Sequence, residues 1–415
     1  MKVAIVGGGI IGLSSAYYLQ KSGCEVTVFD KGDFLDNCSY GNAGYICPSH
    51  FIPLATPGIV KQGLKWMFDS RSPFYVQPRL DFDLLSWAWK FQRHATKKNV
   101  DAAAVPLRDI ALLSKEEYKK WASIAGFDFN YSHKGLLEIF QTEEAASHAQ
   151  HTLKKAHEIG LLDTQILNKE QLQAMEPSVE IKALGALYFA CDAHCYPNKL
   201  MLNLIAQLKG LGVKLIPNAE LKAVNKTHNK IQSLVTDAGI YETDEVVMAT
   251  GSWGKETASL VGINLPLMPG RGYSVTLTDS PFKLNHPSVL VEGRVATTPL
   301  ANNAIRFGGT MEITSHKTPP RLSRVEGILA AIKRYYPEFD VPLPSKENVW
   351  YGYRPCSMDG LPYIGRVSKI KNLTLATGHS MLGLSLGAGT GKLVSEIVCN
   401  KPLSMDITPF LPERS

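Results

Sequence analysis

Three glycines near the N-terminus have a spacing that suits phosphate binding: Gly7, Gly9 and Gly12 form a GxGxxG motif. Gly7 allows a tight turn, Gly9 lets a pyrophosphate approach the backbone, and Gly12 lets the next helix pack closely on the strand. The N-terminus of that helix offers N–H groups and partial positive charge to an anion. Asp30 follows at close to the spacing of about 20 residues at which an acid accepts hydrogen bonds from a ribose diol. The motif predicts a bound adenine dinucleotide; the alternative is a glycine-rich turn without a ligand.

The elements around this motif must hold it in place. Apolar runs over 2–6 and 24–30 flank an apolar helical face, and together they predict a strand–loop–helix–strand unit. Two further runs, 245–249 and 373–376, each lead into a glycine-containing turn. Such runs are typical of buried parallel strands that end at a ligand.

The three glycine turns lie at the start, middle and end of the chain, and two long insertions separate them. The sequence therefore predicts an α/β, Rossmann-like cofactor domain interleaved with an α+β, mixed-sheet substrate domain. Residues 60–135 are expected to be largely helical, with Asp83 capping one helix and Pro106 near the start of another. We expect the cofactor domain to comprise 1–55, 191–265 and 346–415, and the substrate domain 56–190 and 266–345.

Composition excludes several classes of protein. The net charge is +6 without a dense Lys/Arg block, which disfavours nucleic-acid binding. The seven cysteines are scattered, as expected of a reducing, cytoplasmic compartment, and no run reaches the length of a membrane span. The segment Cys191–Cys195, which includes His194, lacks the paired spacing of a zinc site, so no metal is expected.

Five segments together resemble the D-amino acid oxidase superfamily of FAD-dependent amine oxidoreductases. The most specific are an R-P-x-x-x-D-G-x-P-x-I-G block over 354–365 and a G-H-x-x-x-G loop over 378–383. The others are the N-terminal unit, the turn 39–44 and the run 249–253. The resemblance spans nearly the whole chain and implies a glutathione-reductase-type FAD-binding domain.

The resemblance also implies a reaction and the residues that carry it. An amine is oxidised at the carbon that bears its carboxylate, hydride passes from that carbon to flavin N5, and water hydrolyses the resulting imine. Arg354 would hold the substrate carboxylate through its planar fork. His379 would be a positioning residue rather than a proton shuttle, and Tyr273 either lines the substrate pocket or is a buried structural residue. No catalytic base is assigned, because a neutral amine presented to the flavin needs none.

FAD is expected to bind without a covalent link, because the offset of Cys356 from Asp359 does not match the branch that carries a flavin-linking cysteine. Val224 would contact adenine, and the loop after Gly378 would stabilise negative charge on the reduced flavin. The residues expected to bind the cofactor are Gly7, Gly9, Ile10, Ile11, Gly12, Asp30, Lys31, Ser39, Asn42, Ala43, Gly44, Tyr45, Val224, Thr250, Gly251, Gly378, Met381, Leu382, Gly383 and Leu384.

Within the superfamily, the turn 42–44, the Pro-rich stretch after it and 271–274 are most similar to the bacterial D-amino acid dehydrogenase branch. That branch implies D-amino acids as substrates and a quinone or the respiratory chain as electron acceptor. The alternatives are a cis-4-hydroxy-D-proline or D-proline dehydrogenase, a glycine/sarcosine-type oxidase that makes H2O2, a flavin protein without turnover, and a nicotinamide enzyme.

An aromatic and basic stretch could contact a membrane or a quinone, although structural core is its default interpretation. A peripheral position on the inner face of the cytoplasmic membrane is therefore one expected location. The stretch comprises Lys61, Lys65, Trp66, Met67, Phe68, Arg71, Phe74 and Tyr75.

Overall fold

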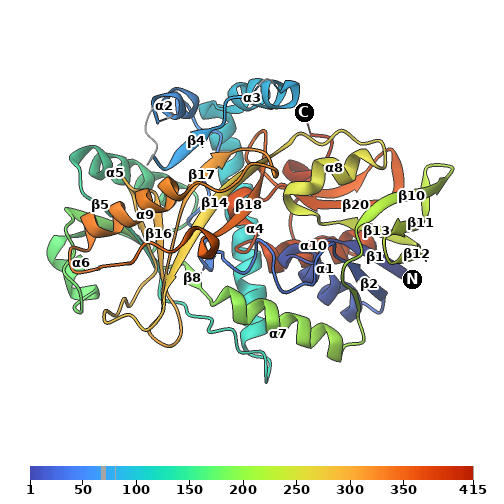
Figure 1. The fold of residues 1–415 in the computed structure, drawn as a ribbon, viewed down its shortest axis with the longest axis horizontal. Coiled ribbons are helices and arrows are strands. Elements are labelled where there is room, and N and C mark those ends of the chain that lie inside the picture. The colour runs from blue at the N-terminus through green and yellow to red at the C-terminus, as the bar shows by residue number, and fades with distance from the viewer. Residues whose placement is uncertain (67–71, 80, 415) are drawn as a thin grey trace.

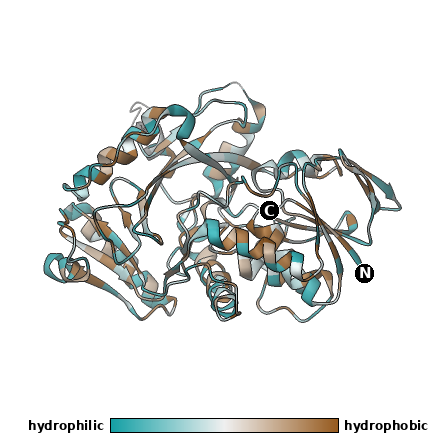
Figure 2. Cartoon of the chain, turned by 60° about the horizontal axis from the view of Figure 1, so that its bottom comes forward, coloured by the Kyte–Doolittle hydropathy of each residue, from teal (hydrophilic) through white to brown (hydrophobic). Residues whose placement is uncertain are grey.

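The computed structural model describes residues 1–66, 72–79 and 81–414. Met67, Phe68 and Arg71 of the predicted membrane-contact stretch lie outside these residues. Within them, the chain forms two large sheets that lie side by side (Figure 1). In Figure 2, hydrophobic residues concentrate in the strands and helices near the centre of the molecule.

The N-terminal strand belongs to a six-stranded sheet of order β19-β20-β13-β1-β2-β9, in which only β19 at the edge is antiparallel. The predicted parallel arrangement of 2–6, 24–30, 245–249 and 373–376 is confirmed. The strands are β1 (Lys2–Val6), β2 (Glu25–Phe29), β9 (Lys214–Ile216), β13 (Glu245–Met248), β19 (Tyr363–Val367) and β20 (Ile370–Thr377).

Both faces of this sheet are covered, which is why its strands are continuously apolar. Val3 and Ile5 of β1 face one core with the helices α1 (Ile10–Lys21), α7 (Pro197–Gly210) and α10 (Gly387–Val398). Ala4 and Val6 face the other core, with the small sheet β10-β11-β12 and α8 (Gly254–Ser259). The small sheet consists of β10 (Leu221–Thr227), β11 (Lys230–Thr236) and β12 (Gly239–Glu242).

The second sheet has nine strands and is mixed, in the order β18-β14-β17-β16-β15-β5-β7-β6 with β4 paired to β17. Helix α9 (Leu322–Tyr335) packs on one face, and α5 (Glu143–Glu158) with the segment 47–51 packs on the other. Helix α6 (Lys169–Met175) contacts β6 and β7. The strands are β4 (Phe74–Val76), β5 (Leu136–Phe140), β6 (Thr164–Asn168), β7 (Gly185–Phe189), β14 (Leu267–Leu277), β15 (Ser288–Leu290), β16 (Val295–Pro299), β17 (Ile305–Ile313) and β18 (Trp350–Ser357).

Two helix predictions were wrong in detail. Asp81, not Asp83, caps α3 (Phe82–His94), because its side chain accepts from the N–H of Asp83. Pro106 lies inside α4 (Lys97–Ala122) rather than near its start. Thr96 begins that helix by accepting from the N–H of Asn99, so the helix starts well before the proline. Helix α2 (Ile59–Trp66) lies beside α3 at the rim (Figure 1).

Two elements depart from the predicted domain boundaries. Helix α4 falls in the segment expected to join the substrate domain, yet Tyr118 and Trp121 pack in the core with α1 and α10. The Tyr118 hydroxyl also donates to the carbonyl of Leu384 over 2.6 Å. Conversely, β18 falls in the segment expected to join the cofactor domain but pairs with β14 of the nine-stranded sheet. The remaining elements are the pair β3 (Tyr45–Ile46) and β8 (Ala193–His194) and the 3-10 turns η1 (Gly251–Trp253), η2 (Lys346–Asn348), η3 (Ser380–Leu382) and η4 (Thr408–Phe410).

Candidate active site

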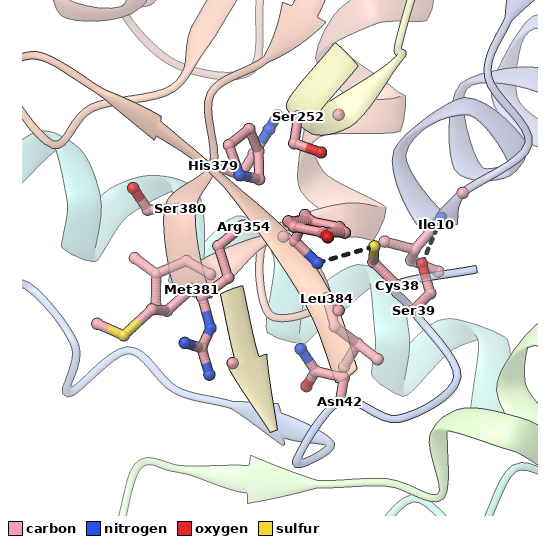
Figure 3. Close-up of a pocket in the computed structure, with 18 of the residues that line it drawn as sticks. Ile10, Cys38, Ser39, Asn42, Ser252, Arg354, His379, Ser380, Met381 and Leu384 are labelled. Carbon is pink, nitrogen blue, oxygen red and sulfur yellow. Dashed lines mark hydrogen bonds between the residues drawn. The ribbon is translucent and has the colours of Figure 1, made fainter. Parts of the chain in front are cut away.

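A cavity of about 810 Å³ lies between the two sheets and is lined by residues of both. Figure 3 shows side chains from distant parts of the sequence, among them Ile10, Asn42, Arg354 and Leu384, around this cavity. The predicted site residues on its wall are Gly7, Gly9, Ile10, Ile11, Asp30, Lys31, Ser39, Asn42, Ala43, Tyr45, Thr250, Gly251, Tyr273, Arg354, His379, Met381, Leu382, Gly383 and Leu384. Those absent from the described wall are Gly12, Gly44, Val224 and Gly378.

The glycine motif at β1 and α1 has the geometry expected of a dinucleotide-binding turn. Gly7 has φ of +109°, and a Cβ there would lie 2.4 Å from the carbonyl oxygen of Ala249. A Cβ on Gly12 would lie 1.8 Å from the carbonyl oxygen of Gly7, so only glycine lets the helix approach this closely. A Cβ on Gly9 would meet only the Ser39 hydroxyl, at 3.6 Å, which leaves the helix N-terminus open to the cavity.

Side chains beyond the glycines complete this turn. Ser39 Oγ accepts from the N–H of Ile10 over 3.1 Å, a contact visible in Figure 3. Asp30 accepts from the N–H of Gly8 over 2.6 Å and from the N–H of Gly32 over 2.7 Å. These bonds fix the carboxylate at the end of β2, beside the cavity.

The loop over 39–45 is held by the nine-stranded sheet, which is called the substrate sheet from here on because most of its strands fall in the predicted substrate domain. The sequence did not reveal this contact. Arg306 of β17 donates to the carbonyls of Tyr40 over 2.8 Å and Asn42 over 2.9 Å. Thr298 of β16 donates to the carbonyl of Ala43 over 2.7 Å. The Tyr45 hydroxyl donates to the carbonyl of Ser288 over 2.7 Å. An arginine and a threonine in strands carry no sequence signal for this role, because only the fold brings them to the loop.

The nucleotide end of the cavity is bounded by Thr250, Gly251 and the segment 219–221. Val224, expected to contact adenine, lies further along β10 and packs against the core of the small sheet. Lys31 lies over the Trp253 ring, 3.4 Å from its centroid, and burial lowers the pKa of its ammonium group.

The loop between β20 and α10 brings His379 to the cavity. Gly378 has φ of +81° and Ser380 has φ of +49°, so the backbone turns sharply on both sides of the histidine. His379 Nε2 forms a 3.0 Å hydrogen bond with Thr390 Oγ1, and burial lowers the pKa of the imidazole to about 3. A neutral, fixed imidazole fits the predicted positioning role.

Arg354 of β18 is a partly buried cation that forms no ion pair with the described residues. Its guanidinium donates to the carbonyl of Thr310 and lies 3.8 Å from the sulfur of Met311. No carboxylate in the described residues pairs with it, and burial lowers the pKa of its guanidinium. A Cβ on Gly272 would lie 2.1 Å from Arg354 Nη2, so the glycine makes room for the side chain.

Tyr273 borders the cavity, but its hydroxyl is occupied. It donates to Glu312 over 2.9 Å and accepts from the N–H of Arg321 over 2.9 Å. This geometry favours the structural interpretation of Tyr273. The Cys356 side chain packs in the core with α3 and is absent from the described cavity wall.

Comparisons with known proteins agree with this geometry. The model of the DAO family, described as FAD dependent oxidoreductase, matches residues 2–397. A D-amino acid dehydrogenase of Rhizobium rhizogenes is 31% identical over 415 aligned residues, covering 98% of each chain. A D-amino acid dehydrogenase of Vibrio atlanticus is 30% identical over 96% of each chain.

Two solved structures share the fold. Glycine oxidase from Geobacillus kaustophilus has a TM-score of 0.76 at 24% identity, covering 100% of this chain and 98% of that one. L-proline dehydrogenase from P. horikoshii has a TM-score of 0.75 at 19% identity, covering 100% and 97%. The predicted architecture and family resemblance are both confirmed.

The residues present fit an FAD molecule. The open N-terminus of α1, where Gly9 leaves room for a pyrophosphate, supplies the nucleotide end, and the loop at His379 supplies the opposite end next to Arg354. Together with a family match over nearly its full length, this establishes that the chain belongs to the DAO family of FAD-dependent oxidoreductases.

Proposed function

We propose that this enzyme oxidises D-amino acids at Cα and passes the electrons to an acceptor other than O2. The observation that carries the proposal is Arg354, a partly buried guanidinium on the cavity wall without a protein carboxylate among the described residues. Burying an uncompensated charge is costly, so the site is built to receive an anion. The carboxylate is the anion that all amino acids share. Relatives at 30–31% identity are named D-amino acid dehydrogenases, which supports the D configuration.

The chain's own residues would act by positioning. Arg354 would bind the carboxylate through two parallel N–H groups, and this would orient the Cα–H bond. His379 stays neutral and holds the loop next to the reaction centre. FAD, when bound, supplies the two-electron acceptor for the hydride from Cα. Released imino acid would be hydrolysed by water to a keto acid and ammonia.

The exposed face of α3 supports a peripheral membrane contact and hence a membrane-borne acceptor such as a quinone. Phe82, Leu85 and Trp89 lie one turn apart along this helix and are 84%, 61% and 59% exposed. Arg93 stacks on the Trp89 ring at 4.7 Å, so a cation sits beside the apolar face. Apolar and basic groups combined on one helix suit an anionic lipid surface. Among the described helices, none has both the length and the apolar character needed to cross a bilayer.

Anaerobic reduction of the bound flavin tests the substrate. We expect D-alanine to bleach the flavin of the holoenzyme faster than L-alanine, glycine, sarcosine or cis-4-hydroxy-D-proline. A faster rate with sarcosine or glycine would favour the oxidase alternative, and one with cis-4-hydroxy-D-proline would favour a proline-type enzyme. No reduction by any amino acid would overturn the proposal.

Aerobic turnover tests the acceptor. We expect a quinone analogue or an artificial dye to be reduced much faster than O2. Peroxide formed in near-stoichiometric amounts with substrate would refute the dehydrogenase assignment. For the membrane contact, Phe82→Ser combined with Trp89→Ser should abolish sedimentation with anionic vesicles without changing dye-linked activity.

A further inference from the structure

A row of cavity-facing residues crosses the substrate sheet away from Arg354. Gly308 of β17 pairs with Ala296 of β16, Ala296 with Val289 of β15, and Val289 with Glu138 of β5. Residues in register on adjacent strands point to the same face, and all four line the cavity. Gly308 and Ala296, which lie at the Arg354 end of the row, have the smallest side chains. The row therefore forms a trough in the sheet surface that ends at the carboxylate of Glu138.

The carboxylate at the end of the trough has no hydrogen-bond donor among the described residues. Glu138 is partly buried and lies on the same sheet face as Leu136 and Phe140, which are in the core. Burial raises the pKa of Glu138 to about 7, and repulsion from the Asp192 carboxylate makes a smaller contribution in the same direction. An adjacent guanidinium would have lowered that pKa. Arg294 also lines the cavity, in the turn before β16, but it is not among the groups that shift the pKa of Glu138.

The opposite wall presents a second hydrogen-bond acceptor. The Ser49 hydroxyl donates to Asp192 Oδ2 and lies 3.1 Å from His50 Nδ1. The Ser49 hydroxyl has only one proton, and it donates this proton to Asp192. In the hydrogen bond between Ser49 and His50, Nδ1 of His50 must therefore be the donor. His50 lines the cavity and its Nε2 is then unprotonated and able to accept a hydrogen bond, because burial lowers the pKa of the imidazole to about 4.

This acceptor wall is fixed next to the loop that follows His379. The backbone N–H of Cys47 donates to Ser385 Oγ over 2.8 Å, and Cys47 is close enough to Glu138 for their charges to interact. The Cys47, His50 and Asp192 ligand atoms lie within 4.8 Å of one another, which would also suit a metal ion. However, the Ser49 hydroxyl already bonds both Asp192 and His50, so an organic cation that needs only Glu138 and His50 fits better.

We propose that Glu138 and His50 bind a positively charged group at the end of the substrate's side chain, so that the preferred substrates are basic amino acids. The proposal rests on the proposed function, in which Arg354 binds the α-carboxylate. Thr310, which contacts Arg354, lies on β17, and Glu138 lies on β5, three strand spacings or about 14 Å away across the strands. Side chains from both ends shorten this gap, and a flexible chain of several carbons with a terminal ammonium spans the rest.

Ligands that cannot be oxidised test the site without turnover. The holoenzyme is titrated at pH 8 with 5-aminopentanoate, 6-aminohexanoate, pentanoate and hexanoate, and binding is followed by the change in flavin absorbance. We expect each ω-amino acid to bind at least about 10-fold more tightly than the alkanoate of the same length, which lacks the terminal ammonium. Equal affinities would overturn the proposal whether or not the enzyme oxidises amino acids.

Three variants locate the effect. Glu138→Gln keeps the shape and should remove most of the preference for the terminal ammonium, and Glu138→Leu should reverse it. Glu256→Gln is the matched control, because Glu256 lines the cavity on the α8 side, 3.7 Å from His316 Nδ1. The Glu256→Gln variant should leave the preference for a terminal ammonium unchanged. Retention of the preference in Glu138→Gln, at full flavin content, would overturn the proposal.

Turnover separates this proposal from the proposed function. In anaerobic flavin reduction, D-lysine and D-ornithine should exceed D-norleucine by about 10-fold or more in kcat/KM, and Glu138→Leu should invert that order. Reduction by D-norleucine but not by D-lysine would refute only the basic-substrate inference. Binding of 6-aminohexanoate without reduction by any amino acid would refute only the proposed function. Stoichiometric zinc that is lost in His50→Ala would identify a metal site and overturn the inference.

Discussion

Two arginines on neighbouring strands differ in how their charges are satisfied. Arg271 of β14 is fully buried and donates to Glu312 over 2.7 and 3.0 Å and to the carbonyls of Thr318 and Pro319. Arg354 of β18 has one carbonyl and a thioether as partners. The hydrogen bonds of Arg271 stabilise the fold, whereas we propose that Arg354 has few partners in the protein because it binds a ligand. The same contrast separates Glu312, which is paired, from Glu138, which has no donor among the described residues.

The largest expected effect concerns the saturated pair. Arg271→Met should lower the free energy of unfolding by about 3–5 kcal/mol, because it leaves the carboxylate of Glu312 buried without its main partner. Urea denaturation of the holoenzyme measures this change. The double variant Arg271→Met/Glu312→Gln should recover part of the loss. A change below about 1 kcal/mol would erase the proposed distinction between the two arginines.

The fold that brings these arginines together was largely predictable from local patterns. Apolar runs identified the parallel strands, because a strand buried on both faces is apolar throughout. Pro106 misled the prediction because proline at a helix start is a statistical preference, whereas tertiary packing of Tyr118 and Trp121 carries α4 through it. The joining of β18 to the substrate sheet depends on pairing with β14, a long-range contact that no local pattern reports.

The second prediction concerns Arg354. Arg354→Met should lower kcat/KM for D-amino acids by about 100- to 1,000-fold, because the carboxylate loses its charged anchor. Its free energy of unfolding should change little or even rise, since a partly buried charge without an ion-pair partner among the described residues is removed. Steady-state kinetics and urea denaturation of the same preparations check both statements. Arg354→Lys keeps the positive charge but not the two parallel N–H groups of the guanidinium, so its kcat/KM should lie between those of Arg354→Met and the wild type. Severe unfolding of Arg354→Met would make this arginine structural.

The candidate site was predictable only where it follows family motifs. The glycine turns, Asp30 and Arg354 lie in such motifs, and the structure brings them to one cavity. Arg306 and Glu138 were missed because each is an isolated polar residue in an apolar strand, and only sheet register shows what it faces. The contact of Val224 with adenine stays a prediction, because Val224 is absent from the described cavity wall whereas Leu221 of the same strand lies on it.

The third prediction uses the raised pKa of Glu138, about 7 against an ordinary value of 4.5. Between these values the folded protein keeps a proton that the unfolded chain has released, so the wild type loses stability as pH rises through this window. Glu138→Gln lacks this dependence. Its advantage over the wild type should grow from pH 5 to pH 8, to on the order of 2 kcal/mol.

Chemical denaturation of both holoproteins across this pH range measures the difference. His50, His148, Cys47 and Arg294 also line the cavity, and Asp192 lies close enough to Glu138 for their charges to interact. All five are present in both proteins, so the titrations of Asp192 and His50 largely cancel in the difference. A constant difference between wild type and variant would mean that Glu138 is ionised throughout, in contact with a cation.

The smallest expected effect concerns His379, whose imidazole has a hydrogen-bond partner on only one nitrogen among the described residues. Nε2 bonds Thr390, and Nδ1 is buried without a partner among the described residues. Because burial lowers the pKa of the imidazole to about 3, it does not titrate between pH 5 and 9. His379→Gln preserves a donor toward Thr390 and should lower kcat/KM by less than about 10-fold, with an unchanged pH profile. His379→Leu should cost more by displacing the loop. If His379→Gln lost the acidic or the basic side of the pH–rate profile, His379 would be a proton carrier. It would then belong neither with the residues that hold the fold nor with those that bind a ligand.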